Sequence, residues 1–262
     1  MDINFKKCGR CTAKNKIGAT KCYACGSSLD VNTKGWSAKG TKVGISDSAG
    51  GGDSLCDAVD IITDATVRIT CRTAQSGSLG TGFFVEEKGK SYLVSNYHVV
   101  QNVVEEGGLI TVRFPDHINP RKDNYHAFPI AVDRVNDLAL LEVQFEISKN
   151  VVPLPLATMS SLRRGQQVVA VGNPRGMEFN CITGIIANEN FRDEDYSMSR
   201  ILCSLNAAPG NSGGPVVRVS DRKVIGVATA IFHPDYMQSH TICTSADALR
   251  QMIYMYERKN KQ

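Results

Sequence analysis

A serine in a glycine-rich turn is the first feature of the sequence that could do chemistry. The segment GNSGGP at 210–215 lies between two apolar runs, which exposes Ser212 and leaves nearby backbone N–H groups free to point at one place. This arrangement suits the attack of a hydroxyl group on a carbonyl carbon. Serine is a poor nucleophile unless a base takes its proton and an acid holds that base. The sequence should therefore also supply a histidine and an aspartate.

Both partners occur upstream at the edges of apolar runs. His98 follows the run YLVSNY, and Asp137 precedes the run LALL. Neither residue is diagnostic alone, because most histidines are surface or structural residues and a GxSGG turn can be only a tight loop. The order His98, Asp137 and Ser212 within one strand-rich pattern favours a catalytic triad.

Short strands are the elements that must position these three residues. From about Cys56 onward, runs rich in Val, Ile, Leu and aromatic residues alternate with Gly, Asn, Asp and Pro, as in ATVRITC, GTGFFVEE, LITVRF, QVVAVGN and KVIGVATAIF. Such a pattern predicts an all-β sandwich or barrel, and VVPLPL at 151–156 divides it into two similar halves. One helix is predicted at the C-terminal end, where Ser245 can cap it and apolar residues recur at helical spacing: Leu249, Met252, Ile253 and Tyr256.

Composition divides the chain into three parts. Residues 1–30 form a module rich in cysteine and lysine, 31–55 have the Gly, Ser, Thr and Lys content of a flexible linker, and 56–262 hold the strand pattern. The first part contains a C-x2-C-x10-C-x2-C spacing, made by Cys8, Cys11, Cys22 and Cys25. Four thiolates at this spacing predict a structural zinc ion and leave no open position for catalysis.

Charge and cysteine usage bear on partners and location. Residues 1–30 carry six lysines or arginines against two aspartates, a surplus equal to the whole net charge of +4. Zinc held by four thiolates would cancel half of that surplus, so nucleic acid is not expected as a partner.

The other five cysteines are dispersed and odd in number, no apolar run reaches the roughly 18 residues of a membrane span, and the start does not match a signal peptide. We therefore expect a cytoplasmic protein without a membrane segment.

In order and spacing, these motifs resemble the trypsin-like serine peptidases, most closely their HtrA/DegP branch. The resemblance covers 56–262 and rests on GSLGTGFFV, LVSNYHVV, NDLALL, VVAVGNPRG and APGNSGGPVV. It implies a double six-stranded β-barrel with a C-terminal helix, in which the first barrel supplies His98 and Asp137 and the second supplies Ser212. It also implies an endopeptidase that cleaves protein or peptide substrates through an acyl-enzyme without a catalytic cofactor, with an oxyanion hole made by the N–H groups of Gly210 and Ser212.

The same resemblance carries expectations about specificity and activation. Segments matching the walls of the substrate pocket are neutral and small, so a small to medium apolar residue is expected before the scissile bond; their residues are Asn206, Ala207, Ala208, Ala228, Thr229 and Ala230. Asn211 stands where digestive relatives carry an aspartate that pairs with a newly cut amino terminus. Activation by clipping is therefore not expected, and the oligomeric state is left open.

The cysteine module resembles the short zinc finger of the Ran-binding-protein type, with Asn15 at its interior position; a generic zinc ribbon is the alternative. Ubiquitin-binding members carry Thr-Phe where this chain has Thr12 and Ala13, and RNA-binding members carry a tryptophan where it has Lys6. Because neither of these ligands is expected, docking of a protein partner or targeting is the role that remains for the finger. Two other functions stay open: a non-catalytic, peptidase-like scaffold that binds protein or nucleic acid through the finger, and a peptidase that cleaves only its own linker.

Overall fold

The computed structural model describes residues 5–7, 14–16, 54–143, 151–192, 200–232 and 240–260. Most of the predicted zinc module, including Cys8, Cys11, Cys22 and Cys25, lies outside the described residues, as does the predicted linker up to 53. Two short strands of that module are described, β1 (Phe5–Lys7) and β2 (Lys14–Lys16), and they pair antiparallel.

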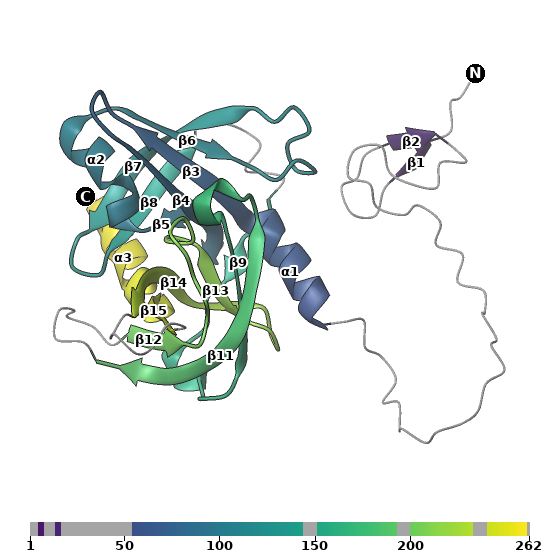
Figure 1. Ribbon diagram of the computed structural model, residues 1–262, viewed down its shortest axis with the longest axis vertical. Coiled ribbons are helices and arrows are strands. Elements are labelled where there is room, and N and C mark those ends of the chain that lie inside the picture. The colour runs from purple at the N-terminus through teal and green to yellow at the C-terminus, as the bar shows by residue number, and fades with distance from the viewer. Residues whose placement is uncertain are drawn as a thin grey trace.

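The rest of the described chain forms two β-barrels (Figure 1). The first contains β3 (Thr66–Arg72), β4 (Gly77–Glu87), β5 (Lys90–Ser95), β6 (Leu109–Arg113), β7 (Asn124–Asp133) and β8 (Leu138–Val143). Its sheet runs β3-β6-β7-β8-β5-β4, and pairing of β4 with β3 closes it. The short strand β9 (Leu154–Pro155) adds to β4 in parallel.

The second barrel is closed in the order β10-β11-β12-β15-β14-β13. Its strands are β10 (Gln167–Gly172), β11 (Asn180–Phe191), β12 (Arg200–Cys203), β13 (Pro215–Arg218), β14 (Lys223–Phe232) and β15 (His240–Ser245). Short 3-10 turns lie at Met159–Ser161 and Pro174–Gly176. The predicted all-β architecture of two six-stranded barrels is confirmed.

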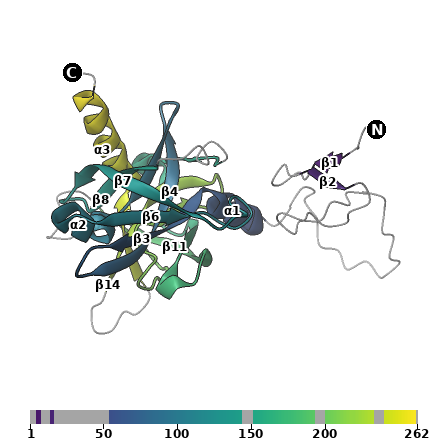
Figure 2. The ribbon, with the colours of Figure 1, turned by 90° about the horizontal axis from the view of Figure 1, so that it is seen from above.

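Three helices accompany the barrels, and one of them was predicted. Helix α3 (Ala246–Lys259) leads to the C-terminal end of the chain (Figure 2). As expected, the Ser245 side chain caps it by accepting a hydrogen bond from Ala248 N, and Leu249, Met252 and Ile253 are buried. This apolar stripe and the other helices join the core of the first barrel to part of the second.

Helices α1 (Ser54–Ala65) and α2 (Tyr97–Glu106) were not predicted. α1 begins two residues before the expected domain boundary and buries Ala58, Ile62 and Ala65 completely, so it belongs to the folded core. α2 carries valines at 99, 100, 103 and 104, a helical spacing that could have revealed it. Strand propensity of valine masked this signal. No described helix is long and apolar enough to cross a membrane.

Candidate active site

His98 and Asp137 meet at the first barrel, as the sequence order suggested. Asp137 Oδ2 lies 2.6 Å from His98 Nδ1, and Asp137 Oδ1 accepts a hydrogen bond of 2.8 Å from the backbone N–H of His98. The carboxylate is mostly covered, with 15% of its side chain exposed, while the imidazole is 44% exposed. These two bonds hold the imidazole on its Nδ1 side. Nε2, on the opposite side of this partly exposed ring, makes no hydrogen bond within the described residues.

Local structure explains how these residues reach one another. His98 sits in the first turn of α2 next to the buried Val99 and Val100, which anchor the helix and turn His98 outward. Asp137 ends the tight turn between β7 and β8 with a φ of 55°, an uncommon conformation for a residue with a side chain. The buried Asn96 stabilises that turn by donating from Nδ2 to Asp137 O at 2.7 Å.

Ser212 lies in the second of two consecutive turns between β12 and β13. Asn211 N donates to Ala208 O and Gly214 N donates to Asn211 O, each at 3.0 Å. Gly210 and Gly213 have φ values of 105° and 85°, which glycine adopts without strain. A Cβ at Gly213 would lie 2.2 Å from Thr81 O, so the turn also needs glycine to approach the first barrel.

Thr81 on β4 joins the serine turn to the first barrel. Its backbone N–H donates to Ser212 O at 2.9 Å and its hydroxyl donates to Gly210 O at 2.7 Å. The same hydroxyl accepts from Asn173 N at 3.0 Å, at the end of β10. Thr81 is completely buried, so these bonds are shielded from water and align the two barrels at the site.

The N–H groups of Gly210 and Ser212 donate to no acceptor in the described part of the chain. The carbonyl of Pro209 accepts from Arg175 N at 2.9 Å, and in a trans peptide the following N–H, that of Gly210, points the opposite way. Both N–H groups are thus available to a ligand. Ser212 Oγ makes no hydrogen bond within the described residues.

A hollow of about 220 Å³ adjoins Ser212. Five of the six expected pocket residues line it, together with Ile231 and Thr241: Ala207, Ala208, Ala228, Thr229 and Ala230. Asn206 is exposed and does not line it. Thr241 had no sequence signal, because only pairing of β15 with β14 brings it beside Ile231. The lining is neutral and made mostly of small side chains.

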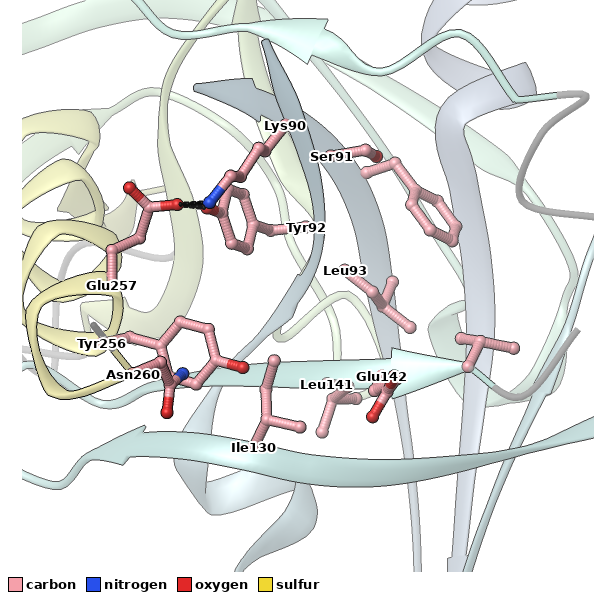
Figure 3. A pocket seen from close by; sticks show the side chains of 12 residues that line it. Lys90, Ser91, Tyr92, Leu93, Ile130, Leu141, Glu142, Tyr256, Glu257 and Asn260 are labelled. Carbon is pink, nitrogen blue, oxygen red and sulfur yellow. Dashed lines mark hydrogen bonds and ion pairs between the residues drawn. The ribbon is translucent and has the colours of Figure 1, made fainter. Parts of the chain in front are cut away.

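Three larger hollows among the described residues flank α3, away from the candidate residues. One of about 740 Å³ lies between α3 and strands β5, β7 and β8 (Figure 3). The figure shows Glu257 on the helix facing Lys90 and Tyr92, and its Oε1 accepts from both, at 2.5 and 2.6 Å. These hydrogen bonds tie α3 to β5, which is a structural role.

The architecture of two closed β-barrels, with a histidine–aspartate pair on one and a glycine-flanked serine on the other, defines a class of peptidases. The chain belongs to the trypsin-like peptidase domain family, whose model matches residues 80–227. The matched segment begins at Gly80 on β4 and includes all three candidate residues.

Similar curated proteins carry the DegP and HtrA names. A probable periplasmic serine endoprotease DegP-like protein of Rickettsia conorii is 36% identical over 171 residues, 62% of this chain and 30% of the relative. The mitochondrial serine protease HTRA2 of Bos taurus is 32% identical over 189 residues, 70% of this chain and 37% of the relative. The chain therefore spans about a third of the length of these relatives.

A solved structure agrees on the fold. The HtrA-type protease AlgW with tripeptide matches with a TM-score of 0.65 and 26% identity, over 78% of this chain and 64% of that one. This likeness supports the HtrA-like architecture that the sequence motifs predicted.

The relatives correct the expected cytoplasmic location. The DegP proteins of Rickettsia and Salmonella typhimurium are named periplasmic, which conflicts with that expectation. That expectation rested on the odd number and the dispersal of the five other cysteines. Cys71, Cys203 and Cys243 are buried, burial raises the pKa of the Cys71 thiol, and a hydrogen bond with Cys203 together with burial raises the pKa of Cys243. A buried thiol packs as a small hydrophobic group, so these cysteines do not report the redox environment.

Proposed function

We propose that the protein is a serine endopeptidase in which His98, Asp137 and Ser212 form the catalytic triad. The observation that carries this proposal is the pair of hydrogen bonds from His98 to the mostly buried carboxylate of Asp137. The first barrel, which holds this pair, is bonded to the Ser212 turn through Thr81. Family membership and the names of the relatives support it.

In this mechanism Ser212 Oγ attacks the peptide carbonyl carbon while His98 Nε2 takes the hydroxyl proton. The imidazolium then gives that proton to the leaving amine, which departs as the C–N bond breaks and the acyl-enzyme forms. Water, deprotonated by His98, hydrolyses the ester and restores the serine. Asp137 accepts a hydrogen bond from the Nδ1–H group of His98 and stabilises the imidazolium. The N–H groups of Gly210 and Ser212 bind the oxyanion, each contributing about 2.7–4 kcal/mol.

A serine-directed fluorophosphonate probe tests the assignment directly. The wild-type chain should be labelled on Ser212, and Ser212→Ala should abolish labelling and lower peptide hydrolysis by several orders of magnitude. His98→Ala should cost about as much, and the double variant no more than either single one, because the residues act as a unit. Ser161→Ala, on an exposed turn, is the matched control and should keep full labelling. An unlabelled wild-type chain would favour the non-catalytic scaffold instead.

The neutral hollow beside Ser212 accommodates the substrate residue before the scissile bond. Its volume of about 220 Å³ and its alanine-rich wall suit a small to medium apolar side chain. Among peptides that differ only at this position, Ala, Val or Leu should give the highest kcat/KM. Lys and Asp should be cleaved poorly, since none of the described residues that line the hollow carries a charge to pair with them. Preference for a charged residue would contradict this assignment.

We also propose a structural zinc ion on Cys8, Cys11, Cys22 and Cys25, in a finger that docks a protein partner. The described pairing of β1 with β2 supports this proposal, because it makes a hairpin whose connecting segment contains Cys8 and Cys11. Four thiolates would close the zinc coordination and supply most of the folding free energy of such a short module.

A further inference from the structure

Arg200 is the largest completely buried side chain of the described residues, with 1% of its surface exposed. It is the first residue of β12 and pairs with Thr244 on β15 in the second barrel (Figure 1). Burying a guanidinium carries a large desolvation penalty unless its N–H groups form hydrogen bonds, so the groups that it contacts indicate its role.

Two of the hydrogen bonds described for Arg200 cross to the first barrel. Arg200 Nη1 donates to Asn136 O at 3.1 Å, and Nη2 reaches Val135 O at 3.4 Å. Nη1 also donates to Thr244 Oγ1, whose own hydroxyl donates to Asn136 O at 2.9 Å. Both carbonyls belong to the β7–β8 turn, immediately before Asp137.

The turn is thereby held from two sides. Within the first barrel, the Asp133 carboxylate accepts from the N–H groups of Val135 and Asn136 at 3.1 and 3.0 Å. From the second barrel, Arg200 binds the carbonyls of the same two residues. With Asn96 Nδ2 on Asp137 O, the peptide groups before and after Asp137 are both fixed.

We propose that Arg200 is a positioning residue that holds the Asp137 backbone in its left-handed conformation, so that both carboxylate oxygens meet His98. The inference rests on the proposed triad and concerns how its acid is placed. Asp137 has a φ of 55° and no glycine-like freedom, so the turn relaxes unless neighbouring groups hold it. Arginine suits the task because its planar fork can bind two carbonyls at once, whereas lysine is a point charge.

The test compares Arg200→Met, Arg200→Lys and Thr244→Val with Arg218→Met. Arg218 is the matched control: it is also buried in the second barrel and donates to a backbone carbonyl, that of Ser161, away from Asp137. We measure kcat and KM on one peptide, urea unfolding, and the far-downfield proton resonance of the His98 Nδ1–H···Asp137 bond.

Arg200→Met should lower kcat by roughly 10²-fold, the scale of a 1 Å misplacement, with little change in KM. It should also weaken or remove the downfield resonance. Arg200→Lys and Thr244→Val should cause smaller losses of kcat, and Arg218→Met should keep both kcat and the resonance even where it lowers stability.

Wild-type kcat in Arg200→Met, or equal losses of kcat in Arg218→Met, would overturn the inference. If Arg200→Met does not fold, the lysine and Thr244→Val variants decide it, since unchanged kcat and resonance in both would equally overturn it. Failure of the triad itself is recognised separately, because the wild-type chain would then show neither fluorophosphonate labelling of Ser212 nor hydrolysis.

Discussion

At the scale of single residues, the site depends on close contacts that small side chains permit. Gly80 on β4 illustrates this: a Cβ there would lie 2.6 Å from one methyl of Val99, next to His98, and 3.2 Å from Ser212 O. One missing methyl group therefore lets the histidine helix and the serine turn approach the same strand.

Gly80→Ala should accordingly lower kcat by about 10-fold or more, because the added methyl must displace Val99 or Ser212 by an amount comparable to the tolerance of a catalytic geometry. Steady-state hydrolysis of a small peptide measures the effect. Gly77→Ala in the same strand is the control, since its Cβ would meet only Cys71 O at an ordinary 3.4 Å. Equal activity of the two variants would show that the site tolerates the displacement.

At the scale of elements, a charged pair stabilises one hairpin of the second barrel. The β13–β14 hairpin, which follows the serine turn, is closed by a bidentate pair: Arg218 Nε and Nη2 donate to the Asp221 carboxylate at 2.9 and 2.7 Å. Arg218 also donates to Ser161 O, so the pair fastens the hairpin to the segment joining the barrels. The hydrogen bond from Arg218 lowers the pKa of Asp221 below its ordinary value.

A carboxyl whose pKa is lowered by folding stabilises the fold above its unfolded pKa of about 3.9 and loses that contribution as pH falls through the lowered value. Asp221→Asn should therefore lower the free energy of unfolding by about 1 kcal/mol at pH 7. The difference from wild type should begin to shrink as pH falls below the ordinary pKa and should vanish below the lowered pKa of the folded state. Urea unfolding at a series of pH values measures it.

Asp116→Asn provides the control for that series. Asp116 is half exposed and pairs with the exposed Lys122, so its loss should change stability less at every pH. An Asp221→Asn difference that stayed constant down to the lowest pH would show that the ion pair is not its source.

At the scale of the whole molecule, catalysis is proposed to depend on two barrels and not on the amino-terminal module. Helix α1 is part of the two-barrel unit, because three of its residues are completely buried in the core. Truncation before α1 and truncation that removes α1 should therefore have different effects.

A chain beginning at residue 54 should hydrolyse a small peptide as fast as the full chain. A chain beginning at residue 66 lacks α1 and should lose at least about 2 kcal/mol of stability, because the cavity left by Ile62 alone costs that much. Thermal unfolding and peptide kinetics on both chains check this. Loss of small-peptide activity in the chain from 54 would make the amino-terminal module part of the enzyme.

Metal analysis of the full chain should find one zinc ion, and Cys22→Ser should lose it without changing small-peptide kinetics, because four-thiolate zinc is structural. Only cleavage of a partner bound through the finger should weaken, through the lost effective concentration. Absence of zinc from the purified full chain would contradict the finger assignment.

The sequence by itself determined the local features of this protein. Strand-length apolar runs, the Ser245 cap and the glycines around Ser212 depend on neighbours within a few residues, and the structure confirms the two barrels and the terminal helix that they predicted. His98, Asp137 and Ser212 could be chosen from residue type and order. The sequence alone was therefore enough to select the three candidates.

Only the tertiary structure decided how distant residues meet. The packing of one barrel on the other brings Thr81 to Gly210 and buries Arg200 behind Asp137. Pairing of β14 with β15 adds Thr241 to the pocket. These contacts join residues between 64 and 129 positions apart or on separate strands, and no local propensity encodes them. Burial in the packed core also made helices of segments whose valines favour strands, because tertiary packing outweighs a propensity of a few tenths of a kcal/mol per residue.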